Sequence, residues 1–258
     1  MKRSSRISVS SRPALLGAVI MLALTSASVA AADDGRGPLG VTVVTGADRQ
    51  SMRVGALFGT ENADDLAGHH FCTASVVHSP QGNLIATAAH CAGGTEGDRV
   101  FVPGYRDGKA PYGVWKVTKR FMPDAWASGE DEDSDVAFAY VEELDGGGRR
   151  IEDVVGANRF AAGTVTGATP VTLTGYPSSL DVPIRCTNKP GRQSPTQQRI
   201  DCPAFTSGTS GSPWVNGSGQ LVGVLGGHER GGSTPDVSYS VAFGRPAAEL
   251  YEDATSGS

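Results

Sequence analysis

This 258-residue sequence lacks three features that would place it in other protein classes. Its longest apolar run, residues 14–24, is shorter than the roughly 18 residues that a membrane-spanning helix needs. The four cysteines include no Cys-x-x-Cys pair, which argues against a thiolate zinc site, and we expect neither a metal ion nor a cofactor. There is no basic cluster, and a formal net charge of −5 argues against nucleic acid or an anionic membrane as a partner.

The first 30 residues have the pattern of a secretory signal peptide. Basic residues precede the apolar run, and Ser28-Val29-Ala30 offers the small residues that signal peptidase requires. We expect cleavage after Ala30, or otherwise after Ala32, and an uncleaved anchor is the alternative. Residues 31–52 begin with small, polar, turn-prone residues and are predicted to form a flexible lead or propeptide. The mature protein is therefore expected to be secreted.

The rest of the chain contains many short segments rich in β-branched and aromatic residues, bounded by glycine, proline or aspartate. A stretch rich in glycine and acidic residues near 143–150 divides them into two halves. The sequence predicts an all-β fold of two six-stranded antiparallel β-barrels, over residues 53–148 and 149–258, with a C-terminal helix at 245–254. The predicted strands are 53–58, 70–77, 84–88, 99–102, 114–120 and 136–141, then 163–166, 171–175, 199–202, 213–216, 220–226 and 237–243.

The four cysteines of an exported chain predict two disulfides. Three pairings are possible. We favour Cys72–Cys91 with Cys186–Cys202, because each pair is close in sequence and one lies in each half.

Three separated segments carry residues typical of nucleophilic catalysis. His90 lies in Thr-Ala-Ala-His-Cys, Asp135 opens an apolar run, and Ser210 lies in Gly-Thr-Ser-Gly-Ser-Pro. A serine hydroxyl needs a base to remove its proton, and a histidine base needs a carboxylate to fix its tautomer. Asp133 is the second candidate for that carboxylate. The acidic run 130–133 is interpreted as a solvated loop, with calcium binding as the alternative.

These segments resemble the three signature segments of the trypsin/chymotrypsin-like serine proteases, over about residues 53–252, and are nearest to secreted bacterial members such as the V8-like group. The resemblance implies a monomeric chymotrypsin-like endopeptidase acting on polypeptides. It implies that His90 is the general base, that Asp135 orients it and that Ser210 is the nucleophile. The backbone N–H groups of Gly208 and Ser210 would form the oxyanion hole.

Departures from the family bear on activation and specificity. Thr209 stands where many members carry the aspartate that receives a new N-terminus. Ala204, followed by Phe205, stands where trypsin-like members have the aspartate at the floor of the specificity pocket. A buried lysine or arginine of the substrate would lack a counter-charge there, so strict basic specificity is not expected. Asp236 could still supply a charge from another wall.

The segment after the strand at 220–226 is predicted to form the wall of the substrate pocket. It comprises Gly226, Gly227 and His228. His228 could recognise an acidic side chain, and an exposed loop histidine is the favoured alternative. Two other functions stay open: an inactive protease-fold binding protein, and an esterase that uses the same three residues.

Overall fold

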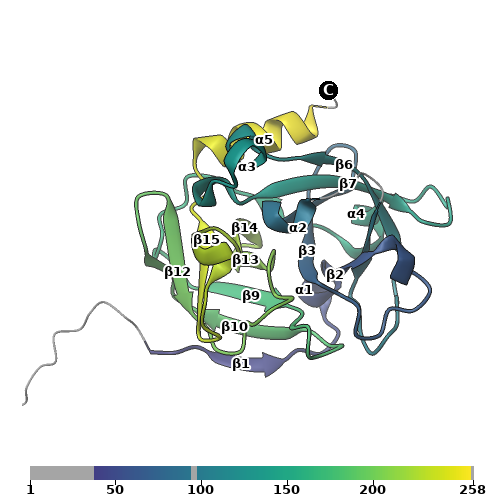
Figure 1. Cartoon of the computed structure of the whole chain (residues 1–258), viewed down its shortest axis with the longest axis horizontal. Helices are drawn as coiled ribbons and strands as arrows, with labels where there is room; N and C mark the ends of the chain where they lie inside the picture. The colour runs from purple at the N-terminus through teal and green to yellow at the C-terminus, as the bar shows by residue number, and fades with distance from the viewer. Residues whose placement is uncertain (1–37, 94–97, 257–258) are drawn as a thin grey trace, which may run out of the picture. The chain divides into compact units, whose positions relative to one another are not determined.

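The computed structural model describes residues 38–93 and 98–256, so the predicted signal peptide lies outside the described residues. The fold is built mainly from β-strands, and the first half closes into the predicted six-stranded barrel (Figure 1). Neighbouring strands of the barrel pair in antiparallel fashion. In order around the barrel they are β2 (Val54–Gly59), β3 (Cys72–Val77), β4 (Leu84–Thr87), β7 (Ala137–Glu143), β6 (Trp115–Phe121) and β5 (Arg99–Pro103).

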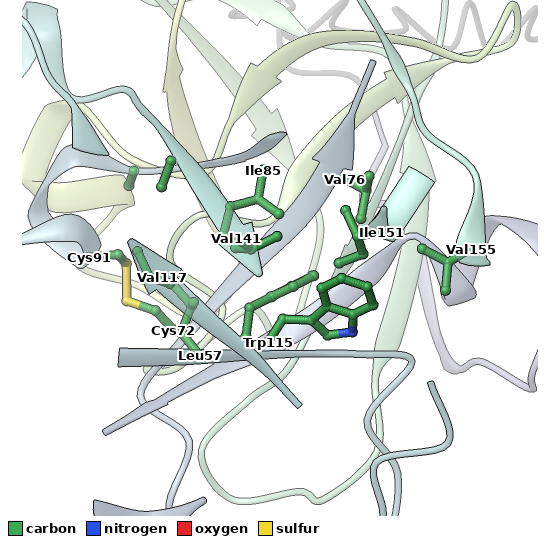
Figure 2. Packing of buried hydrophobic residues seen from close by; sticks show 14 residues of the cluster. Leu57, Cys72, Val76, Ile85, Cys91, Trp115, Val117, Val141, Ile151 and Val155 are labelled. Atoms are coloured by element: carbon green, nitrogen blue, oxygen red, sulfur yellow. A yellow bond between two sulfur atoms is a disulfide. The ribbon is translucent and has the colours of Figure 1, made fainter. Parts of the chain in front are cut away.

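Side chains along the barrel strands point alternately to two packed faces. Leu57 and Trp115 point into the barrel and belong to its inner core (Figure 2). Phe58, the neighbour of Leu57, packs on the outer face with Tyr176 of the second half. Successive strand side chains point to opposite faces, so a strand that is apolar throughout serves both faces. This explains why nearly every residue of β2 and β3 is buried, including the polar Thr73 and Ser75 of β3.

The second half consists of two sheets. The prediction of an all-β fold is confirmed, but hydrogen bonding divides this half into a six-stranded and a three-stranded sheet. The larger sheet has the order β1 (Val41–Val44), β10 (Ile184–Asn188), β9 (Val171–Gly175), β13 (Pro213–Asn216), β14 (Gln220–Val224) and β8 (Arg159–Phe160). The smaller has the order β11 (Gly191–Arg192), β12 (Gln197–Asp201) and β15 (Val237–Val241).

The larger sheet begins within residues 31–52, the segment predicted to be a flexible lead or propeptide. The described part of this segment, 38–52, contains a strand and a short helix. The β-branched run of β1 pairs with β10, and Asp48 caps α1 (Arg49–Met52) by accepting from the N–H groups of Gln50 and Ser51. An ion pair from Arg185 to Asp48, 2.7 Å long, also fastens the segment to the second half.

The helices are short apart from the last one. Ala247, Leu250 and Ala254 form the buried face of the predicted C-terminal helix, which lies along β6 and β7 (Figure 1). No helix among residues 38–93 and 98–256 is long and apolar enough to cross a membrane. The helices are α1, α2 (Ala89–Ala92), α3 (Asp124–Gly129), α4 (Ile151–Val155) and α5 (Arg245–Thr255), with 3-10 turns η1 (Thr60–Asn62), η2 (Glu132–Ser134) and η3 (His228–Gly231).

Both predicted disulfides are confirmed. Cys72–Cys91 ties β3 to α2, and Cys186–Cys202 ties β10 to the residue after β12. Closing loops of 19 and 16 residues stabilises the fold by about 3 kcal/mol each, chiefly by restricting the unfolded chain.

Hydrogen bonds to Asp181 connect the two halves. Tyr105 in the first half donates its hydroxyl to Asp181 in the second at 2.6 Å, and the N–H of Gly68 donates to the same oxygen at 2.9 Å. The bond from Tyr105 is the main reason that the pKa of Asp181 lies below its usual value. This carboxylate therefore stabilises the folded state above the ordinary aspartate range, and its contribution is lost as the pH falls through the lowered pKa.

Thr73 of β3 is the main polar joint between the halves. It is fully buried, and its N–H donates to the carbonyl of Ser210 at 2.7 Å. Its hydroxyl donates to the carbonyl of Gly208 at 2.9 Å and accepts from the N–H of Tyr176 at 3.0 Å. Its own carbonyl accepts from the hydroxyl of Thr87 at 2.8 Å. Every polar group of Thr73 therefore has a hydrogen-bond partner. The partners of its N–H and hydroxyl groups lie in the second half, so these bonds fix how the two halves contact each other.

Thr73→Val should lower both stability and activity. The change keeps the shape but leaves the buried Tyr176 N–H and Gly208 carbonyl without their partner, at about 1–3 kcal/mol for each unsatisfied group. Urea unfolding and initial rates on a peptide substrate would measure both effects. Thr172→Val, which removes only the bond to Thr187 on a more exposed pair of strands, is the matched control. Equal losses of stability and activity in the two variants would show that Thr73 has no special role in connecting the halves.

Candidate active site

The structure brings His90 and Asp135 together at the boundary between the halves. His90 lies on α2, and Asp135 lies between η2 and β7. Nδ1 of His90 is 2.7 Å from Oδ2 of Asp135, and the backbone N–H of His90 donates to Oδ1 at 3.0 Å. The carboxylate side chain is fully buried, whereas 11% of the histidine side chain is exposed. A buried carboxylate holding one ring nitrogen leaves the other for proton transfer.

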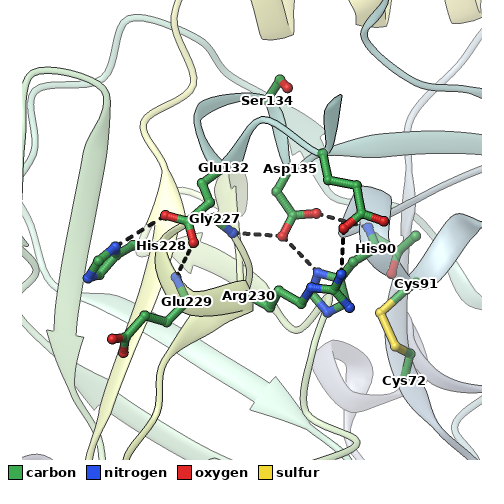
Figure 3. Close-up of polar contacts among 12 residues, drawn as sticks. Cys72, His90, Cys91, Glu132, Ser134, Asp135, Gly227, His228, Glu229 and Arg230 are labelled. Carbon is green, nitrogen blue, oxygen red and sulfur yellow. Dashed lines mark hydrogen bonds and ion pairs between the residues drawn. A yellow bond between two sulfur atoms is a disulfide. The ribbon is translucent and has the colours of Figure 1, made fainter. Parts of the chain in front are cut away.

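A third donor to Asp135 comes from the second half. The N–H of Gly227 donates to Oδ2 at 2.8 Å, and Figure 3 shows Asp135 between Gly227 and His90. The preceding Gly226 is needed for this approach, because a Cβ there would be 2.8 Å from Oδ2 of Asp135. Both glycines were predicted to lie in the wall of a substrate pocket. Their contact with the carboxylate was not predicted, since a backbone donor has no side-chain signature.

Ser210 lies in a tight loop that contacts β3. Its carbonyl accepts from the N–H of Thr73, which follows Cys72, and the Cys72–Cys91 disulfide leads to the residue after His90. The next residue, Gly211, has φ 81°, and a Cβ there would lie 2.1 Å from the carbonyl oxygen of Thr73. The loop can therefore approach β3 only with glycine at this position.

The same loop contains two available N–H groups. Within the described residues, neither the N–H of Gly208 nor that of Ser210 donates to a protein acceptor, as the predicted oxyanion hole requires. Gly208 has φ 90°, and a Cβ would be 2.6 Å from the backbone nitrogen of Ser178. Thr209 between them is buried and donates its hydroxyl to the carbonyl of Thr206 at 2.6 Å.

The residues predicted for the pocket floor lie in different surroundings. Ala204 is exposed with φ 71°, an unusual backbone conformation for alanine. Phe205 is buried in the core of the second half, together with Trp214 and Leu225. Asp236 is exposed. Contact of these residues with substrate stays a prediction.

Acidic residues before Asp135 join the loop after Gly227. We call these contacts the acidic clasp: Glu130 pairs with Arg230 at 2.5 Å, and Glu132 contacts both Nδ1 of His228 at 3.3 Å and the N–H of Glu229 at 2.9 Å (Figure 3). Glu130, Glu229 and Arg230 all have φ near 50°, which is costly without glycine. The contacts of the clasp thus hold a strained turn beside Asp135.

The other candidate acid faces away from the histidine. Oδ1 of Asp133 accepts from the side-chain amide of Gln197 at 2.9 Å, whereas Asp135 alone of the two contacts His90. His228, the candidate reader of an acidic substrate, lies edge-on to the ring of Tyr239, with the ring centres 4.8 Å apart.

One group of side chains has the composition of a metal site. Possible ligand atoms of Cys72, His90 and Cys91 lie within 4.8 Å of one another. Both sulfurs are joined in the disulfide, however, so neither can act as a thiolate ligand.

Comparison with known proteins agrees with this geometry. The model of the trypsin-like peptidase domain matches residues 72–224, which include His90, Asp135 and Ser210. The chain belongs to this family. No protein among the curated ones matches it.

Solved structures of trypsin-like proteases have the same fold. Protease Anisep from Arthrobacter nicotinovorans is 27% identical, with 84% of this chain and 100% of that chain covered and a TM-score of 0.70. The thermostable serine protease AL20 from an extremophilic microorganism is 26% identical, with 82% and 100% covered and a TM-score of 0.68. A Glu endopeptidase, 18% identical with 85% and 98% covered and a TM-score of 0.66, shares the fold.

Gly226→Ala should reduce peptidase activity by at least about tenfold, because its Cβ would displace the carboxylate of Asp135 from the position that holds His90. The measurement is kcat/KM on a peptide substrate, with folding checked by circular dichroism. Gly217→Ala is the matched control, since a Cβ there meets no atom within 4 Å. If a folded Gly226→Ala variant retains full activity, the close approach of this glycine is not required.

Proposed function

We propose that this protein is a secreted serine endopeptidase that hydrolyses peptide bonds through Ser210, His90 and Asp135. The observation that carries the proposal is the buried carboxylate of Asp135 with three donors, two from His90 and one from Gly227. This arrangement fixes Nδ1–H toward the aspartate and leaves Nε2 as the base. The two disulfides and the signal-peptide pattern of residues 1–30 support export.

The proposed reaction proceeds in two halves. Nε2 of His90 accepts the proton of the Ser210 hydroxyl as its oxygen attacks the carbonyl carbon of the substrate. The N–H groups of Gly208 and Ser210 stabilise the resulting oxyanion. His90 then gives the proton to the leaving amine, and an acyl-enzyme forms. Water, activated by the same imidazole, attacks the ester and releases the acid and Ser210.

Asp135 acts through His90 in this reaction. Its negative charge stabilises the imidazolium that forms while the serine attacks, and it does not itself take up the proton. Only the neutral imidazole can accept the serine proton.

Variants of Asp135, Asp133 and Ser210 test the assignment of the triad. Asp135→Asn should lower kcat by about 10⁴-fold, because the amide favours the wrong histidine tautomer. Ser210→Ala should lose activity by several orders of magnitude and retain its unfolding midpoint. Asp133→Asn, which changes an acid that contacts Gln197, is the matched control. An active Asp135→Asn together with a crippled Asp133→Asn would reverse the assignment.

Active-site labelling separates this proposal from its alternatives. A fluorophosphonate should modify Ser210 in the wild-type protein, and no labelling would favour the inactive binding protein. Labelling with ester turnover but no peptide cleavage would favour the esterase. Labelling of Ser210, together with cleavage of an internal peptide bond by the unlabelled protein, would support the endopeptidase.

We further propose that cleavage does not require a basic residue before the scissile bond, and that the protein acts as a monomer. Ala204 provides no counter-charge for a substrate cation. One structural neighbour is a Glu endopeptidase. In this chain, however, Nδ1 of His228 already contacts Glu132, so its positive form would be partly neutralised within the protein.

Matched peptides ending their acyl part in Arg, Leu or Glu would test this specificity. We expect the Arg peptide to have no large advantage in kcat/KM over the Leu peptide, because burying an unpaired cation is costly. A large preference for Arg that Asp236→Ala abolishes would show that the charge comes from Asp236. A preference for Glu that His228→Ala abolishes would instead assign recognition to His228.

A further inference from the structure

We propose that a second site, outside the candidate active site, binds a small organic carboxylate with an aromatic body. The site is a cavity of about 250 Å³ between α1, the loop from β5 to β6, and the loop from β9 to β10. Its lining includes none of the residues assigned to catalysis. The proposal therefore does not depend on the peptidase activity.

The walls of the cavity are suited to an apolar ring. Its lining includes the apolar or aromatic side chains of Met52, Pro111, Tyr112, Tyr176 and Pro183. Tyr176 is fully buried and belongs to the core at the boundary between the halves, so this wall is rigid. Such concave, aromatic walls bury the body of a ligand, and a few polar groups then fix its orientation.

The polar groups come from one tight turn. The backbone N–H groups of Arg106 and Lys109 donate to each other's carbonyls at 3.2 and 2.9 Å, which closes a two-residue turn through Asp107 and Gly108. The two turn residues have φ of 50° and 74°, as in the turns preferred in β-hairpins. Arg106 and Lys109 thus stand directly opposite each other, and both line the cavity.

This placement of two cations is locally unfavourable. Like charges on directly opposite residues destabilise a strand pair. Within the part of the chain that the structure describes, neither Arg106 nor Lys109 forms an ion pair with a carboxylate. The guanidinium of Arg106 donates to the carbonyl of Thr45 at 2.5 Å, which holds it at the cavity.

Asp107 reduces the positive charge at this site without removing it. Its exposed side chain also lines the cavity and has no ion pair among the described residues, so the three side chains together carry one net positive charge. A ligand carboxylate would relieve the repulsion between Arg106 and Lys109. Such a conflict with the local rule for charge pairing is expected at functional or strained sites, and here it lies beside a preformed cavity.

The test is binding of 3-phenylpropionate to the folded protein, measured by calorimetry. We expect a dissociation constant at or below about 1 mM. The uncharged 3-phenylpropionamide should bind at least about fivefold more weakly, and acetate, which lacks the ring, should bind more weakly still. Equal binding of the acid and its amide would overturn the proposal, and so would equal binding of acetate and 3-phenylpropionate.

Charge variants locate the site. Lys109→Gln should weaken binding about threefold, and Asp107→Asn should strengthen it by a similar factor, because they change the local charge in opposite directions. Lys189→Gln, on an exposed residue outside the cavity, is the matched control and should have no effect. If Lys109→Gln binds like the wild type, the carboxylate lies elsewhere.

A labelled protein separates the cavity from the candidate active site. Protein whose Ser210 carries a fluorophosphonate group should bind 3-phenylpropionate with unchanged affinity. Loss of binding after labelling would place the ligand in the active site and overturn the proposal. The comparison of 3-phenylpropionate binding by Lys109→Gln and by the wild type still tests the cavity if Ser210 proves not to be a nucleophile.

Discussion

The arrangement of the candidate active site depends on one buried residue, Thr73, through both its backbone N–H and its hydroxyl. Its hydrogen bonds to Ser210, Gly208 and Tyr176 fix the serine loop on a strand of the first barrel. The neighbouring Cys72 is covalently joined to the helix that carries His90. The proposed base, His90, and the proposed nucleophile, Ser210, come from different halves of the chain, so their relative position requires such a joint. A hydrogen bond in a buried, low-dielectric setting tolerates little displacement, which makes it suitable for this purpose.

Asp135 is likewise held by contacts from both halves of the chain. It follows the first barrel's acidic loop, and a backbone donor from the second half meets it. Because that donor is the N–H of Gly227, its position depends on the turn that the acidic clasp holds. Loss of either Glu130 or Arg230 from the clasp would free a strained backbone beside a buried charge. The strain is offset by contacts between the halves, as expected where a structure must over-determine a functional conformation.

The first barrel could be predicted from sequence more completely than the second half. Its six strands are short segments with many β-branched and aromatic residues between turn residues, and each lies close to its predicted position. In the second half, 171–175 and 213–216 were predicted to the residue, but 163–166 is not a strand and β10 was missed. β1 was not predicted, because it follows a polar segment and its pairing partner lies more than 100 residues away in the sequence. Short strands whose partners are distant in sequence have little local signal.

In the candidate site, side chains were predicted from the sequence, whereas backbone contacts were not. His90, Asp135 and Ser210 were predicted because the proposed chemistry requires particular side chains in particular sequence contexts. The backbone donors that contact Asp135 were not predicted, because every residue except proline has an N–H group. Glycine is the one indirect signal: at Gly211 and Gly226 a Cβ would occupy the space of Thr73 or Asp135. In this protein the glycines near the motifs therefore mark where the backbone of one half must come into contact with the other.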